Sequence, residues 1–132
     1  MLANLERFID DASQYKEESV HHAITLIGTL SRYLDKNGQK KLIHTFEKMM
    51  ALLLRPKNKG ASEMVNKSIC KCVPKLVHYF DEKAKHAFNE MFQILRHGKH
   101  EHEIRGAAYG CAGIAKGFGL KFFIERDILG II

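Results

Sequence analysis

The sequence predicts an all-α fold in which antiparallel helix pairs stack on one another into a solenoid. Apolar residues recur at spacings of three and four along nearly the whole chain, which is the period of an α-helix. No segment alternates between apolar and polar residues with the period of two that marks a strand. One apolar pattern returns at intervals of about 40 residues, and residues that favour turns separate its copies.

The repeated pattern begins at Val20, Val65 and Ile104, which are 45 and 39 residues apart. Each of these residues is followed by apolar or small residues four, seven and eight positions later, so each copy forms one face of a helix. A second helical pattern precedes each copy. A two-helix unit of about 40 residues is typical of HEAT and armadillo repeats, which stack into α-solenoids.

We expect a single HEAT-like array over residues 1–132, as a fragment of a longer solenoid. Its units are expected at about 1–36, 39–80 and 82–119, with a lone helix in 120–132. Asn37-Gly38 is expected to end one helix, and Pro74 to kink another without breaking it. Because the last helix is apolar and has no following unit to cover it, we expect it to make the fragment self-associate. The expected helices are 2–10, 17–35, 39–54, 62–80, 82–96, 102–118 and 121–131.

Composition narrows the function only slightly. The 132 residues carry a net charge of +6 at neutral pH, which favours acidic partners or nucleic acid. Three cysteines, an odd number in a chain without a secretory signal, indicate reduced thiols in a reducing compartment. No apolar run approaches the length of a membrane span, so no membrane contact is expected.

The expected helix 102–118 holds four glycines on one side. At about 100° per residue, Gly106, Gly110, Gly113 and Gly117 fall within a stripe about 60° wide. A glycine inside a helix costs about 0.5–1 kcal/mol relative to alanine, so an aligned set suggests a neighbour that comes unusually close. We expect close helix packing at these glycines, and a groove for a partner is the alternative. An apolar stripe is expected to pack on the opposite side and consists of Ile104, Ala108, Cys111, Ala115 and Phe118.

Three strings in this chain resemble one family of HEAT-repeat proteins. The most specific is RGAAYGCAGIAKGFGL (residues 105–120), and TLIGTLSRYLDK (25–36) and SICKCVPKLV (68–77) match the same region in the same order. Together they resemble the central HEAT array of the ribosome-associated general-control activator of the kinase that phosphorylates the alpha subunit of initiation factor 2.

This resemblance implies a non-catalytic segment of a very long cytoplasmic scaffold. That family detects stalled or colliding ribosomes, works with an ABC-class partner and helps activate the kinase when amino acids are scarce. Its kinase-binding segment lies outside the stretch matched here, so the resemblance assigns no kinase contact, and it carries over no catalytic residue and no cofactor. The alternative is a HEAT scaffold from another family, such as nuclear transport or phosphatase regulation, which would share the fold without the glycine-rich string.

Basic residues supply the candidate contact with a ribosome or RNA. Lys67, Lys71 and Lys75 follow one another at intervals of four on one face of the expected helix 62–80. Stacked units would line up the basic turns beside this face into a positive edge suited to phosphates, so direct binding of ribosomal RNA is an alternative to protein binding. A solvated face without a partner is the third possibility. The basic residues in those turns are Arg55, Lys57, Lys59, Arg96 and Lys99.

Neither an enzyme nor a metal site is expected. Cys70 and Cys72 are two apart on a helix and point in different directions, which does not suit one metal ion. His97, His100 and His102 crowd a glycine-containing turn and are interpreted as solvated. The sequence holds no nucleophile elbow and no phosphate-binding loop.

Overall fold

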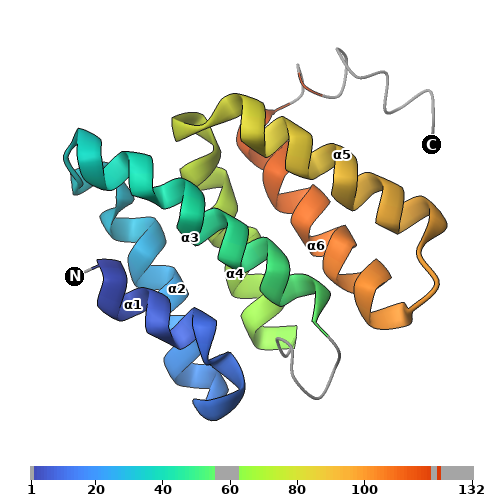
Figure 1. The fold of residues 1–132 in the computed structure, drawn as a ribbon, viewed down its shortest axis with the longest axis horizontal. Coiled ribbons are helices and arrows are strands. Elements are labelled where there is room, and N and C mark those ends of the chain that lie inside the picture. Colours follow the sequence, from blue (N-terminus) through green and yellow to red (C-terminus); the bar gives the residue numbers. More distant parts are fainter. Residues whose placement is uncertain (1, 56–62, 120–121, 123–132) are drawn as a thin grey trace.

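The structure, a computed structural model, describes residues 2–55, 63–119 and 122. Its described residues form six α-helices, and consecutive helices run in opposite directions (Figure 1). Helices α1, α3 and α5 lie in one layer, and α2, α4 and α6 lie in a second layer behind it in this view. The predicted all-α fold of stacked helix pairs is therefore confirmed. The helices are α1 (Leu2–Asp10), α2 (Glu17–Leu30), α3 (Lys36–Leu54), α4 (Glu63–Leu76), α5 (Asp81–His97) and α6 (Glu101–Phe118).

Two helices are shorter than the sequence predicted. α2 ends at Leu30 and α4 ends at Leu76, and each continues as one 3-10 turn, Ser31–Tyr33 and Val77–Tyr79. The hydrogen bonds of the tighter turn satisfy carbonyl groups at the end of the helix before the chain reverses toward the next helix. Apolar periodicity does not distinguish an α-helix from a 3-10 helix over three residues. The sequence-based prediction therefore counted each 3-10 turn as part of the α-helix before it.

The start of α3 corrects the expectation that Asn37-Gly38 ends a helix. Both residues belong to the first turn of α3. The side chain of Asp35 accepts a hydrogen bond from the Gly38 backbone N–H at 2.8 Å, which satisfies one of the free donors at the helix start. An aspartate three residues before the glycine therefore outweighs the turn signal of the Asn-Gly pair.

Pro74 lies inside α4, and the helix continues past it to Leu76, as predicted. Proline has no backbone N–H, so the Cys70 carbonyl loses its usual partner four residues on. That carbonyl faces α6: a Cβ atom built on Gly113 would lie 3.1 Å from the Cys70 oxygen. The interruption in α4 therefore lies at its interface with the next pair.

The core lies between the two layers and follows the repeated pattern in the first two units. Val20 and Ile24 of α2 are buried, as are Val65 and Ile69 of α4. In α6 the repeated pattern that begins at Ile104 does not give the buried face, because Ala108, four residues after Ile104, is exposed. In α6 the buried residues at the same spacing are Ala107, Cys111, Ile114 and Ala115. A shift of three residues rotates the packed face by about 60°, toward the glycines.

Polar side chains join α1 to α3 beside this core. The Thr45 hydroxyl donates to Glu6 at 2.7 Å, and the Lys48 ammonium lies 2.6 Å from Glu6 and 3.1 Å from Asp10. These carboxylates are the main cause that raises the pKa of Lys48, partly opposed by burial. The short first helix is therefore tied down by charge as well as by its buried Ile9.

The expected lone helix 121–131 lies outside the described residues except for Phe122. The Phe122 ring is buried and packs edge-to-face on Phe88, with 4.8 Å between the ring centroids. It also stacks on Phe118 of α6 at 5.1 Å. The expectation that this segment drives self-association stays a prediction.

Candidate interaction surfaces

The clearest basic surface follows the boundary between α2 and α4. Lys67, Lys71 and Lys75 are exposed on successive turns of α4 and line two hollows that α2 shares. His21 of α2 is hydrogen-bonded to Ser68 of α4 between these helices. One hollow is lined by His21, Glu63, Met64, Lys67, Ser68 and Lys71, and the other by Gly28, Thr29, Ser31, Arg32, Lys75 and Tyr79. We call the three lysines with Arg32 the basic face.

The cations of the basic face are only weakly neutralised. Lys67 lies 3.4 Å from Glu63 one turn earlier, and both side chains are mostly exposed. Within the part of the chain that the structure describes, Lys71 and Lys75 have no ion pair. Two unpaired ammonium groups one helical turn apart form a site that suits an anionic partner.

Helix α6 adds a further cation near this surface. Burial raises the pKa of the Cys70 thiol, and the charges of Lys116 and Lys71 oppose that rise. The two lysines therefore lie close to the same thiol although they belong to different helices. Sequence reasoning did not place Arg32 and Lys116 near the lysines of α4, because only the stacking of α2 and α6 on α4 brings them there.

The other predicted basic residues lie at helix ends. Arg55 directly follows α3, Arg96 lies in the last turn of α5, and Lys99 lies in the turn before α6. The Arg96 guanidinium sits over the Phe92 ring at 5.9 Å. Among the described residues, no ion pair joins these three to the lysines of α4. Lys57 and Lys59 lie outside the described residues.

The glycines of α6 meet backbone and side chains of three neighbouring helices. A Cβ atom on Gly106 would overlap the Leu53 carbonyl of α3, with the carbonyl carbon only 2.6 Å away. On Gly117 it would overlap Val77 and lie 3.0 Å from the Pro74 Cα atom of α4. The contact at Gly110 is looser: the end of Met91 of α5 would lie 3.2 Å away. Gly106, Gly110 and Gly113 are buried, and Gly117 is half-buried.

The three cysteines are unpaired thiols, and Cys72 and Cys111 are buried. Cys72 packs on Gly28 of α2, whereas Cys70 lies toward α6, so the two thiols face different neighbours. Burial raises the pKa of Cys72 and of Cys111 to about 12, which keeps both thiols protonated and unreactive. Within residues 2–55, 63–119 and 122, no cluster of three His, Cys, Asp or Glu side chains could hold a metal ion.

Comparison with known proteins gives this fold a context. Over 134 residues, 100% of the chain, it is 28% identical to the human protein named "Stalled ribosome sensor GCN1". The mouse protein of that name is 30% identical over 109 residues, 83% of the chain. The Saccharomyces cerevisiae protein named "eIF-2-alpha kinase activator GCN1" is 30% identical over 110 residues, 82% of the chain. This chain is similar to a segment of GCN1.

That similarity confirms the resemblance inferred from the three strings. The chain spans only about 4–5% of the length of these GCN1 relatives. Their names describe a sensor and an activator rather than a catalyst. No family model and no solved structure matches the chain. In the described part of the chain, no helix is long and apolar enough to cross a membrane.

Proposed function

We propose that this chain is a non-catalytic segment of a GCN1-type scaffold that works on stalled ribosomes in the cytoplasm and helps activate the eIF-2-alpha kinase. The observation that carries the proposal is the similarity to GCN1 along the whole chain. The fold supports it, because stacked helix pairs present an extended surface for binding. An ABC-class partner and a kinase contact outside these residues are part of the same proposal.

The basic face is the surface that we propose for the ribosome contact. Lys71 and Lys75 have no ion pair within the described residues, and Lys75 lies beside Arg32 in an open hollow. Ammonium groups on an exposed helix bind phosphate oxygens and release counterions, so RNA is the part of the ribosome that this surface suits. The protein-scaffold role and an RNA contact are therefore compatible.

Co-sedimentation with purified ribosomes tests the ribosome contact. We expect the chain to bind, and Lys67→Glu, Lys71→Glu and Lys75→Glu together to weaken binding by about tenfold or more at physiological salt, since several phosphate contacts are lost. The matched control is Lys36→Glu, Lys40→Glu and Lys41→Glu, which makes the same change in net charge on exposed positions of α3. Equal loss in both variants would mean that only net charge matters and would contradict the assignment.

The salt dependence of binding separates RNA from protein contact. An RNA contact should lose affinity steeply between about 50 and 200 mM salt, and the variant with glutamate at positions 67, 71 and 75 should lose that steepness.

Kinase activation needs a separate measurement. In yeast, this chain should replace the matching stretch of GCN1 and preserve phosphorylation of eIF-2-alpha during amino-acid starvation. Loss of that phosphorylation in a stable chimera would contradict the scaffold role.

A further inference from the structure

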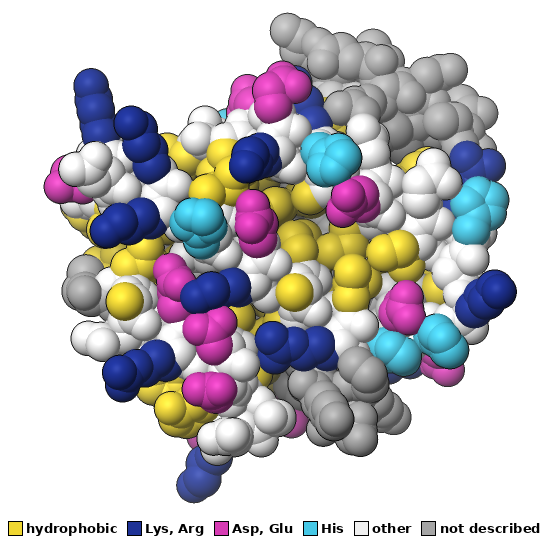
Figure 2. Space-filling view, viewed as in Figure 1, with side chains coloured by type: hydrophobic (Ala, Val, Ile, Leu, Met, Phe, Trp, Pro, Cys, Tyr) yellow, Lys and Arg dark blue, Asp and Glu magenta, His cyan; other side chains and the backbone are white. Residues whose placement is uncertain are grey.

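Helices α3 and α5 are neighbours in their layer but make few direct contacts with each other. Both rest on α6 instead, and α6 comes close enough to α3 for Gly106 to meet the Leu53 carbonyl. The space left between α3 and α5 is an open groove of about 650 Å³. Figure 2 shows apolar side chains exposed in this part of the surface, with charged side chains around them.

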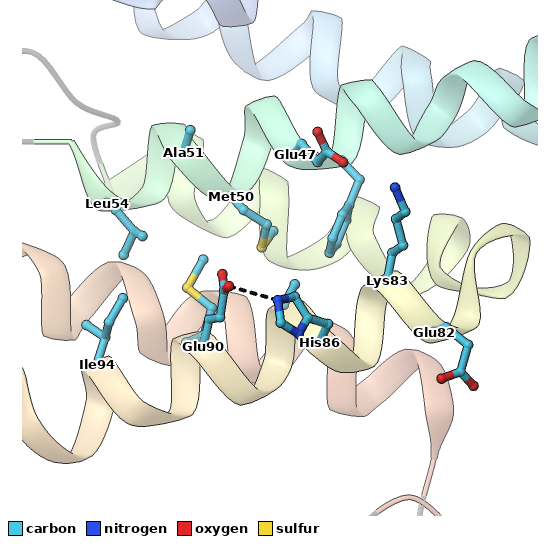
Figure 3. A pocket seen from close by; sticks show the side chains of 12 residues that line it. Glu47, Met50, Ala51, Leu54, Glu82, Lys83, His86, Glu90 and Ile94 are labelled. Atoms are coloured by element: carbon cyan, nitrogen blue, oxygen red, sulfur yellow. Dashed lines mark ion pairs between the residues drawn. The ribbon is translucent and has the colours of Figure 1, made fainter.

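Apolar side chains form the walls and the floor of this groove. Phe46, Met50 and Met91 are largely buried beneath it. Leu54 of α3 and Ile94 of α5 are only half-buried and face each other near one end (Figure 3). Methionine side chains adapt their shape at low cost, which suits a surface that accepts apolar side chains from outside.

The length of the groove matches a short helix. Its walls run from Phe46 to Leu54 along α3 and from Glu82 to Ile94 along α5. At 1.5 Å per residue these stretches are about 12 and 18 Å long, which is two to three turns of a helix. A helix with apolar residues at spacings of three and four places its side chains in such a groove.

The rim of the groove is acidic, in contrast to the rest of this basic chain. Glu47 stands on the α3 wall and Glu90 on the α5 wall (Figure 3). Glu82 lies near the start of α5, where Lys83 is the one lysine among the lining residues. The His86 side chain lies 2.9 Å from Glu90, one turn away on the same helix. Positive residues on a bound helix would complement the carboxylates of this rim.

We propose that this groove binds an amphipathic helix of a partner protein, with apolar residues on one face and Lys or Arg along its flanks. The groove is in the layer formed by α1, α3 and α5, whereas the basic face is on α2 and α4. The site is therefore separate from the proposed ribosome contact and does not depend on it. The negative charge of its rim disfavours acidic helices and the other anionic partners that the basic face favours.

Two synthetic peptides test the proposal on the full chain. Each is a fluorescein-labelled helix of about 14 residues with leucines at spacings of three and four, and the flanks are lysine in one peptide and glutamate in the other. Fluorescence anisotropy at physiological salt measures binding. We expect saturable binding of the lysine peptide, at least about tenfold tighter than that of the glutamate peptide. Glu47→Lys with Glu90→Lys should reduce or reverse this preference.

Two variants, each with one alanine replaced by lysine, locate the site. Ala51→Lys places a long cationic side chain in the groove and should weaken binding of the lysine peptide by about tenfold or more. Ala112→Lys makes the same change at an exposed helical position of α6 and should leave binding unchanged. Circular dichroism checks that both variants fold.

Four outcomes would overturn the proposal. These are no saturable binding of the lysine peptide, equal binding of both peptides, binding that survives Ala51→Lys in a folded variant, and a dimer of this chain that Ala51→Lys dissociates. The last result, measured by analytical ultracentrifugation, would assign the groove to a second copy of the chain.

Discussion

At Gly106 the backbone of α6 meets the Leu53 carbonyl of α3 with no room for a side chain. Gly106→Ala should therefore destabilise the chain by about 1–3 kcal/mol, the usual scale of overpacking, although alanine favours a helix. Gly110→Ala is the matched control, because its new methyl group meets the movable end of Met91 at 3.2 Å. We expect the control to be neutral or stabilising. Urea unfolding measures both variants, and equal stabilities would contradict close packing at Gly106.

A larger side chain at Gly110 tests the same interface differently. Leucine there would collide with Met91 and with the Leu53 side chain, which lies 3.4 Å from the Cβ position. Gly110→Leu should therefore lower the melting temperature, whereas a partner groove at this position would leave it unchanged or raise it.

The buried thiols should make the folded chain less stable at alkaline pH. Burial raises the pKa of Cys72 and of Cys111 to about 12, above the ordinary value of 9.0. Between these values the unfolded chain releases protons that the folded chain keeps, so stability falls as the pH rises above about 9. Melting temperatures measured from pH 8 to pH 10.5 should decline, and Cys72→Ala should make that decline shallower. An identical slope in both proteins would show that the thiol does not contribute.

Among the helices, α3 has the clearest start signal. The side chain of Asp35 accepts the Gly38 N–H, so Asp35→Ala should cost about 0.5–2 kcal/mol. Asp11 precedes the 3-10 turn Ala12–Gln14 and makes no such hydrogen bond, which makes Asp11→Ala the matched control. Denaturant midpoints should separate the two variants, and a cost at Asp11 as large as at Asp35 would contradict the capping argument.

The helices that the sequence predicted best are those whose large apolar residues face the core. In α2 and α4 the pattern that begins at Val20 and Val65 gives the buried face directly. In α6 most of the buried residues are glycines and alanines, and the large residue Ile104 is only half-buried beside the turn. The pattern that begins at Ile104 therefore selected a face about 60° away from the buried one.

For the candidate surfaces, the sequence predicted only the residues that lie together on a single helix. Three lysines at intervals of four identify one face of α4 without any tertiary information. Arg32 and Lys116 join that surface only because α2 and α6 stack beside α4. The groove between α3 and α5 has no sequence signal, because it depends on both helices resting on α6.

In the molecule as a whole, local stability should fall from α6 toward α1. Helix α6 contacts α3, α4 and α5 and contains seven buried residues, whereas α1 contains one. Native-state hydrogen exchange should therefore show the amides of α1 opening first and those of α4 and α6 last. Protection in α1 equal to that in α6 would indicate that the whole chain opens as one unit.

The close approach of α6 to α3 limits how freely these units could be exchanged. Repeat arrays are often shortened, lengthened or reshuffled because each unit needs only a generic neighbour. Here the second helix of one unit needs a glycine where the first helix of the preceding unit presents a carbonyl. The second and third units therefore form a matched pair, and a graft, deletion or duplication that preserves the fold should carry both together.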